Sequence, residues 1–281
     1  MTPFRLQIRT LALLWIRRIG GESGKILEEI WAFGSESLDV DLGFCSLKVD
    51  LRDPTFDPLD DAVMGQVYPP DNNRSDPPPA LNAVRLSRSL LKDILDPSTF
   101  RIVLKALRLW AERRCIYGKS FGYFGGVSWA IMVADACQRY PGASADDILM
   151  RLFQENAGRL KECDSWSDWT IILGDIMHRE YGYRVFNPMN VDTQVPQIVT
   201  PCYPAENTTY DVNQSAMERI RKEFLRAAHV KCGHWDSLWE LMDFFATARY
   251  CLCIAIANRR STIMTAAYAQ ATVGQRFILR R

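Results

Sequence analysis

Three glycines inside one aromatic stretch constrain the fold of this chain more than any other feature. Gly122, Gly125 and Gly126 lie in the stretch FGYFGGVSWA, residues 121–130, which leads into an apolar run. A Gly-Gly pair before a helical pattern lets the backbone turn sharply and come close to a ligand. The same pattern fits a tight turn between two helices, in which the glycines serve close packing alone. The stretch therefore predicts a sharp turn into a helix and leaves open whether a ligand binds there.

The chain as a whole has the composition of a globular protein. Of its 281 residues, 48% are hydrophobic and 24% charged, and the formal net charge is +1. Any contact with RNA must therefore come from a local patch rather than from the overall charge. Eight cysteines occur without a CxxC pair, which favours reduced intracellular thiols over a disulfide framework or a zinc site. No apolar run approaches the roughly 20 residues of a membrane helix, so we expect no membrane partner.

Motifs on both sides of the glycine stretch give it a family context. They are FRIVLKALRLWAERR at 100–114, IY at 116–117, CQRYP at 137–141, VTPCYP at 199–204 and NTTYDV at 207–212. In this order and at these spacings the chain resembles the eukaryotic poly(A) polymerases, whose pattern runs FR…LRAIKLWAKR…IY…GFxGGVSWA…CQLYPNA and then TPAYP…NSTYNV. The resemblance covers residues 38–279 with gaps, and block 100–141 carries most of it. It implies a template-independent polymerase that adds AMP from ATP to RNA 3′ ends.

Residues 38–47 alternate as a strand does and place Asp39 and Asp41 on one face. Such a pair fits a magnesium site, because hard cations prefer carboxylate oxygens, and it also fits the solvated face of an edge strand. The family resemblance implies that Asp41 is a catalytic aspartate and a ligand of Mg²⁺ or Mn²⁺, whereas Asp39 matches a noncatalytic acid beside it. ATP is the implied substrate.

The family's other two catalytic carboxylates lie in a G-S…D-x-D motif well upstream, and residues 1–37 hold no match to it at the required spacing. A catalytic metal pair normally needs bridging carboxylates. We therefore expect a truncated form that is weakly active or inactive. The alternative is a noncatalytic helical scaffold that binds RNA or processing factors.

The resemblance also implies a nucleotide site. Arg108 stands where the family has a phosphate-binding lysine, which keeps the charge but changes its geometry. Lys119 stands where the family has an asparagine, a second departure. Taken over from the family pattern, the nucleotide-binding residues are Asn82, Arg108, Tyr117, Gly126 and Val127.

Several local patterns predict helices. Asp96-Pro97 supplies a cap and a first-turn proline, and apolar residues then recur at helical spacing, with Trp110 among them. Trp110 and Trp129 are expected in the core rather than under a base. Further helix starts are predicted by Ser144 with Asp147, Ser215 with Glu218, and Ser237 with Glu240.

The expected fold is α+β with a mostly helical centre, between a partial nucleotidyltransferase sheet and a partial RRM-like sheet that includes a strand at 250–257. Residues 53–79, rich in proline and aspartate, are predicted to be mostly irregular. The expected domains are an unassigned segment 1–37, a remnant of the nucleotidyltransferase domain with its linker at 38–80, a central domain at 81–230, and the start of an RNA-binding domain at 231–281.

Partners and location follow from the resemblance. The RNA 3′ end, ATP and mRNA 3′-end processing factors are the implied partners, and the nucleus is the implied location. The first 24 residues, with Arg5, Arg9, Arg17 and Arg18 around an apolar core and no acid before Glu22, are also typical of a mitochondrial presequence.

Overall fold

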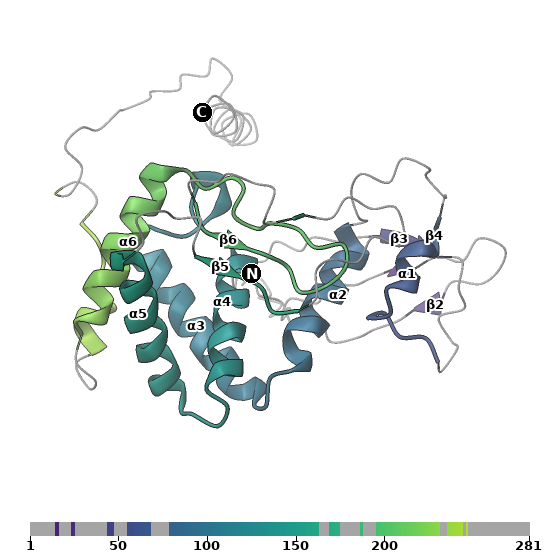
Figure 1. The fold of residues 1–281 in the computed structure, drawn as a ribbon, viewed down its shortest axis with the longest axis horizontal. Coiled ribbons are helices and arrows are strands. Elements are labelled where there is room, and N and C mark those ends of the chain that lie inside the picture. Colours follow the sequence, from purple (N-terminus) through teal and green to yellow (C-terminus); the bar gives the residue numbers. More distant parts are fainter. Residues whose placement is uncertain are drawn as a thin grey trace, which may run out of the picture.

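The computed structural model describes residues 15–16, 24–25, 44–47, 55–68, 79–162, 169–174, 186–187, 195–230, 235–243 and 246. Most of these residues are helical, as Figure 1 shows. The longer helices are α2 (Pro79–Lys92), α3 (Pro97–Arg113), α4 (Gly126–Arg139), α5 (Ala145–Glu162) and α6 (Gln214–Ala228). No helix within the described ranges combines the length and the apolar character needed to cross a membrane.

Helix α3 begins where its sequence predicts. Asp96 is the N-cap and accepts hydrogen bonds from the Ser98 N–H (2.9 Å) and the Ser98 hydroxyl (2.6 Å). Pro97 takes the first helical position, where its missing N–H costs nothing. The apolar face from Phe100 to Ala111 is buried against α4 and α5, so the predicted helix is confirmed.

Six aromatic side chains meet between the helices, and each is almost completely buried. The ring of Trp110 lies 4.8 Å from that of Phe153, 5.2 Å from Phe224 and 6.1 Å from Trp129, centroid to centroid. The tilted and edge-on geometries of these pairs are those that aromatic rings favour. The core positions predicted for Trp110 and Trp129 are confirmed. The full set is Trp110, Phe124, Trp129, Phe153, Trp169 and Phe224.

A small sheet precedes the helices. Its strands are β1 (Trp15–Ile16), β2 (Gly24–Lys25), β3 (Phe44–Leu47) and β4 (Val67–Tyr68), in the order β2-β1-β3-β4. β1 runs parallel to β3, and β3 runs antiparallel to β4. The predicted strand at 38–47 is confirmed over 44–47, and residues 38–43, with Asp39 and Asp41, lie outside the described residues. Helix α2 contacts β3 and so connects the sheet to the helices (Figure 1).

The segment predicted to be irregular at 53–79 contains regular structure. A short helix, α1 (Ala62–Gly65), leads into β4 (Val67–Tyr68), and these six residues are the regular part of this otherwise irregular described segment, 55–68. Asp57 and Asp60 start the turn, because their carboxylates accept hydrogen bonds from the N–H groups of Leu59 (2.8 Å) and Ala62 (2.9 Å). Burial of Val63 and Met64 then holds the helix on the rest of the protein.

The predicted helix starts differ in outcome. The Ser144 hydroxyl accepts from the Asp147 N–H at 3.4 Å and donates to its carboxylate at 2.9 Å, as expected before α5. Helix α6 begins earlier than the pair Ser215 and Glu218 predicts. Its N-cap is Asn213, whose side-chain oxygen accepts from the Ala216 N–H at 2.9 Å and so fixes the first turn.

Residues 238–243 are not helical, so the helix predicted from Ser237 is wrong there; these residues follow a 3₁₀ turn, η4 (Trp235–Ser237). Arginines of neighbouring helices bond the carbonyl groups of this segment, in place of N–H groups one turn further on. Arg226 donates to the carbonyls of Ser237 (2.8 Å) and Leu238 (3.4 Å). Arg113 donates to Trp239 (2.7 Å) and Arg114 to Glu240 (3.0 Å).

Two further strands lie beside α4. β5 (Thr170–Ile171) and β6 (Gln197–Ile198) pair in parallel, and both contact α4. The hydroxyl of Ser128, in the first turn of α4, donates to Thr208 Oγ1 at 2.9 Å, and Thr208 Oγ1 donates to the Ile198 carbonyl at 2.8 Å. This chain of bonds fixes the start of α4 to the loop that follows β6.

Replacing Asp96 by alanine should destabilise the protein in a pH-dependent way. Hydrogen bonds, chiefly from the hydroxyls of Ser98 and Thr99, lower the pKa of Asp96 from 3.8 to about 2. Because the folded-state pKa lies below the unfolded one, this stabilisation is complete above pH 3.8 and disappears as the pH falls through about 2. Urea midpoints of wild type and Asp96→Ala should differ near neutral pH and converge in acid. A difference that does not change with pH would contradict this role.

Candidate functional site

The glycine stretch forms a compact turn between α3 and α4. Gly118 and Gly122 have φ angles of +111° and +77°, which side chains with a Cβ rarely adopt. The Gly118 N–H donates to the Phe124 carbonyl at 3.0 Å, and Tyr117 bridges to Phe124. A Cβ on Gly122 would lie 3.1 Å from the side-chain nitrogen of Asn213, so a larger residue would also crowd the start of α6.

Arg108 and Tyr117 form the polar part of the site beside this turn. The guanidinium carbon of Arg108 lies 5.3 Å from the centre of the Tyr117 ring, within the range of a cation–π contact. Arg108 Nε also donates to Glu112 Oε1, one helical turn further along α3, at 2.8 Å. The side chain of Arg108 is 21% exposed and that of Glu112 is 43% exposed, so both charges reach solvent.

The environment of Tyr117 favours its neutral form. Desolvation by partial burial raises the pKa of the Tyr117 hydroxyl, and the charge of Glu112 adds to this shift. The positive charge of Arg108 acts in the opposite direction. At neutral pH the phenol therefore remains protonated and can donate a hydrogen bond to an anion.

The start of α4 lies next to Tyr117. Gly125 is the N-cap residue of α4. Because glycine has no side chain, the first N–H groups of the helix receive no hydrogen bond from a capping side-chain oxygen. Gly126 and Val127 open the helix and are partly exposed. The N-terminus of a 14-residue helix carries partial positive charge and suits an anion or a polar ligand edge.

Lys119 contacts the start of α4 and the loop before α6. Its side chain lies against Gly125, where an added Cβ would meet Lys119 Cγ at 3.2 Å. Its amino group lies 3.7 Å from the Asp211 carboxylate and 4.2 Å from the centre of the Tyr210 ring. The residue at which the chain departs from the family asparagine thus contacts the loop before α6.

The structure brings four of the predicted site residues together around one turn. Arg108, Tyr117, Gly126 and Val127 lie around one turn, joined through the Tyr117–Phe124 bridge and the Arg108–Tyr117 contact. Asn82 lies on α2, where its side-chain oxygen accepts a hydrogen bond from the sulfur of Cys202 at 3.7 Å. Asp41 lies outside the described residues.

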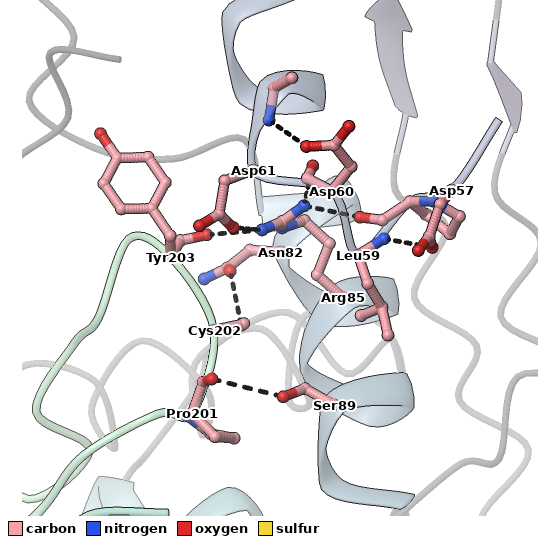
Figure 2. A network of polar contacts seen from close by, with 12 residues as sticks. Asp57, Leu59, Asp60, Asp61, Asn82, Arg85, Ser89, Pro201, Cys202 and Tyr203 are labelled. Atoms are coloured by element: carbon pink, nitrogen blue, oxygen red, sulfur yellow. Dashed lines mark hydrogen bonds and ion pairs between the residues drawn. The ribbon is translucent and has the colours of Figure 1, made fainter. Parts of the chain in front are cut away.

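Figure 2 shows the surroundings of Asn82, which centre on Arg85. The guanidinium group of Arg85 is completely buried, and its Nη1 donates to the carbonyls of Pro58 (2.6 Å) and Asp60 (2.7 Å). Its Nη2 donates to the Asp61 carboxylate and to the Tyr203 carbonyl (3.3 Å). One side chain of α2 therefore joins the loop before α1 to the loop at 201–204.

Cys202 belongs to the same network but is not a reactive thiol. Burial raises the pKa of its thiol to about 12, although the charge of Arg85 opposes the shift. The thiol therefore remains protonated at physiological pH, and thiolate chemistry is disfavoured. The protonated thiol donates a weak hydrogen bond to the side-chain oxygen of Asn82 at 3.7 Å.

Two residues that the sequence interpretation did not single out, Glu112 and Arg85, are central to these networks. Glu112 follows Arg108 by four residues, the spacing of a helical ion pair, which is the sequence signal for their contact. Arg85 follows Leu81 by four residues on α2 and shares its buried face. An arginine on the apolar face of a helix indicates that its guanidinium group bonds to polar groups in the interior, such as backbone carbonyls.

The described residues do not assemble a metal site. They contain no cluster of three His, Cys, Asp or Glu side chains placed to share one ion. Asp41, the predicted ligand, is not among the described residues. The part of the chain described in space therefore does not by itself fit a catalytic metal centre.

Comparison with known proteins adds family information to this geometry. Residues 99–245, just over half of the chain, match the family model described as Poly(A) polymerase central domain. A Poly(A) polymerase of Dictyostelium discoideum is 35% identical over 185 residues, covering 63% of this chain and 22% of that protein. Poly(A) polymerase pla1 of Schizosaccharomyces pombe is 31% identical over 189 residues, covering 64% of this chain and 32% of its own length.

A longer alignment joins the chain to a plant protein. Nuclear poly(A) polymerase 4 of Arabidopsis thaliana is 28% identical over 225 residues, which are 77% of this chain and 29% of that protein. The chain thus spans between about a fifth and a third of the length of these relatives. The alignment with a solved Cid1 poly(U) polymerase structure with Mg and 3′-dATP covers 58% of this chain and 61% of that one, with 17% identity and a TM-score of 0.43.

Replacing Arg85 by methionine should destabilise the protein strongly. The change leaves buried carbonyl groups of two loops without a donor, and we expect a loss of about 3 kcal/mol or more in the free energy of unfolding. As a matched control, Arg221→Met removes a partly exposed arginine that pairs with Glu218 at 3.4 Å, and should cost less than about 1 kcal/mol. Urea unfolding measures both values. Equal losses in the two variants would show that Arg85 does not hold the loops together.

Proposed function

Because the chain belongs to the poly(A) polymerase family, we propose that its site around Arg108 and Tyr117 binds ATP and serves the transfer of AMP from ATP to RNA 3′ ends. The family implies a nucleotide substrate and a divalent metal ion. The observation that carries the proposal is the meeting of a cation, a neutral phenol and an open helix N-terminus at one turn.

Arg108 is suited to phosphate in this arrangement. Glu112 accepts a hydrogen bond from Arg108 Nε. Among the described residues, none accepts a hydrogen bond from the two Nη groups of Arg108. A guanidinium group presents these donors in a planar fork that matches two phosphate oxygens. The contact with Tyr117 limits how far the guanidinium group can swing, so less conformational entropy is lost when a ligand binds.

Gly126 and Val127 are suited to the base and its surroundings. Val127 is partly buried against the aromatic core, and its exposed part offers an apolar surface to a flat ring. The absence of a Cβ at Gly126 allows a ligand to approach the backbone closely. We assign adenine to this side of the turn and the phosphates to the side of Arg108 and Tyr117.

The transfer itself is a displacement at phosphorus. The oxygen of the RNA 3′ hydroxyl bonds to the α-phosphorus of ATP, the bond to the pyrophosphate oxygen breaks, and the hydroxyl proton passes to solvent. Positioning and neutralisation of charge dominate such reactions, and Arg108 contributes both to the bound nucleotide. Mg²⁺ or Mn²⁺, for which we propose Asp41 as a ligand, would supply further charge neutralisation when bound.

The cellular setting is proposed from the relatives. Since several relatives are named nuclear poly(A) polymerases, we place this protein in the nucleus, with the 3′ ends of mRNA precursors as its substrate. Factors of mRNA 3′-end processing are the proposed protein partners. Asn82, which lies in the Arg85 network, is proposed to reach the nucleotide from the α2 side.

Replacing Arg108 by alanine should weaken ATP binding by about tenfold to a hundredfold, which corresponds to about 1–3 kcal/mol for a charge-assisted hydrogen bond. Competition against a fluorescent ATP analogue measures the affinity. Arg151→Ala is a matched control, because Arg151 lies 4.6 Å from the Tyr140 ring in a similar cation–π contact on α5. Arg108→Lys should recover part of the lost affinity.

The outcomes separate the two functions considered for the chain. If wild type binds ATP and Arg108→Ala binds it equally well, the nucleotide lies elsewhere. If wild type binds no ATP but does bind RNA or processing factors, the chain acts as a scaffold and the proposal is wrong.

A further inference from the structure

Glu112 is a negatively charged residue inside a site proposed to bind a polyanion. It lies one helical turn beyond Arg108 on the exposed side of α3, and its Oε1 accepts from Arg108 Nε at 2.8 Å. The side chain is 43% exposed, so the carboxylate is not needed to satisfy a buried group. A carboxylate that only solubilised the helix could lie anywhere on this face, whereas this one pairs with the cation of the site.

The charge of Glu112 also extends to Tyr117. The carboxylate acts with burial to raise the pKa of the Tyr117 hydroxyl, while Arg108 lowers it. The three side chains of Arg108, Glu112 and Tyr117 thus share one local field. A phosphate group bound to Arg108 and Tyr117 would therefore experience repulsion from Glu112 as well as attraction to Arg108.

We propose that Glu112 determines how strongly the site prefers ligands with more phosphate charge. Glu112 holds the guanidinium group by the Nε of Arg108, and it repels the phosphates that the Nη groups of Arg108 bind. The inference rests on the proposed function, in which Arg108 contacts the phosphates of ATP. Pairing orients the guanidinium fork, and the negative charge reduces its net attraction for polyphosphates. The site then binds ATP less tightly than its arginine alone would, and it discriminates less strongly between ATP and AMP.

The orienting effect and the repulsion can be separated by an isosteric change. Glu112→Gln keeps an oxygen that accepts from Arg108 Nε and removes only the charge. If repulsion dominates, the variant binds ATP more tightly. The gain should increase with the charge of the ligand, because each added phosphate contributes its own repulsion from the carboxylate.

The test measures the binding of ATP, ADP and AMP to wild type and Glu112→Gln by competition with a fluorescent ATP analogue. At low salt we expect Glu112→Gln to bind ATP about threefold to tenfold more tightly, with a smaller gain for ADP and the smallest for AMP. The gain should shrink at high salt because the charges are partly exposed. Glu218→Gln is the matched control, since Glu218 is 44% exposed and pairs with Arg221 and Lys222 on α6, and its affinities should equal those of wild type.

A double variant connects the effect to Arg108. In an Arg108→Ala background, Glu112→Gln should give a smaller gain for ATP, because without the arginine the phosphates are no longer held close to the carboxylate. Equal or weaker ATP binding by Glu112→Gln, or an equal gain for ATP and AMP, would overturn the inference. Circular dichroism and thermal unfolding verify that each variant is folded.

The proposed function fails in a different way. If Arg108→Ala leaves the affinity for ATP unchanged, the nucleotide does not contact Arg108, and the assignment of the site falls together with the role of Glu112. If Arg108→Ala weakens ATP binding but Glu112→Gln does not strengthen it, the site is correct and only the role of Glu112 is wrong.

Discussion

The aromatic cluster around Trp110 is the interaction on which the rest of the described structure depends. Its rings come from α3, from the turn, from α4 to α6 and from the residue before β5, so their burial holds these segments together. Burial of Trp110 also fixes how α3 is rotated, and Arg108, two residues earlier, then lies on the outer side of the helix. Phe124 and Trp129 anchor the α4 side of the glycine turn in the same way.

Arginines provide a second set of connections between segments that are distant in sequence. Arg85 holds the loop before α1 and the loop at 201–204 through carbonyl groups, and Figure 2 shows both loops converging on it. Arg114 and Arg226 share the buried carboxylate of Glu223 and also bind carbonyls of residues 237–240. A guanidinium group suits this role because its five N–H donors can satisfy several carbonyls at once. The site therefore lies on a scaffold whose loops are tied to helices.

Local signals in the sequence predicted the helical centre well. The cap at Asp96 and the capping pair at Ser144 depend on side chains within three residues of the helix start, so they can be read without knowledge of the fold. The apolar period of α3 likewise reports its buried face. The motifs in block 100–141 were sufficient to predict the family, which the match over residues 99–245 confirms. The helix predicted from Ser237 was wrong for a long-range reason. Arginines from α3 and α6 bind the carbonyl groups that such a helix would have used.

By itself the sequence determined the family, the helical centre and the residues that surround the turn, because these depend on short patterns of residues. Only the tertiary structure decided which of those residues meet. It brought Arg108 to Tyr117, directed Lys119 to Asp211 and placed Asn82 beside Cys202. These contacts join residues between 9 and 120 positions apart, and no local pattern specifies the partners. They depend on how helices pack around the aromatic core, and packing is a property of the whole set of segments rather than of any one of them.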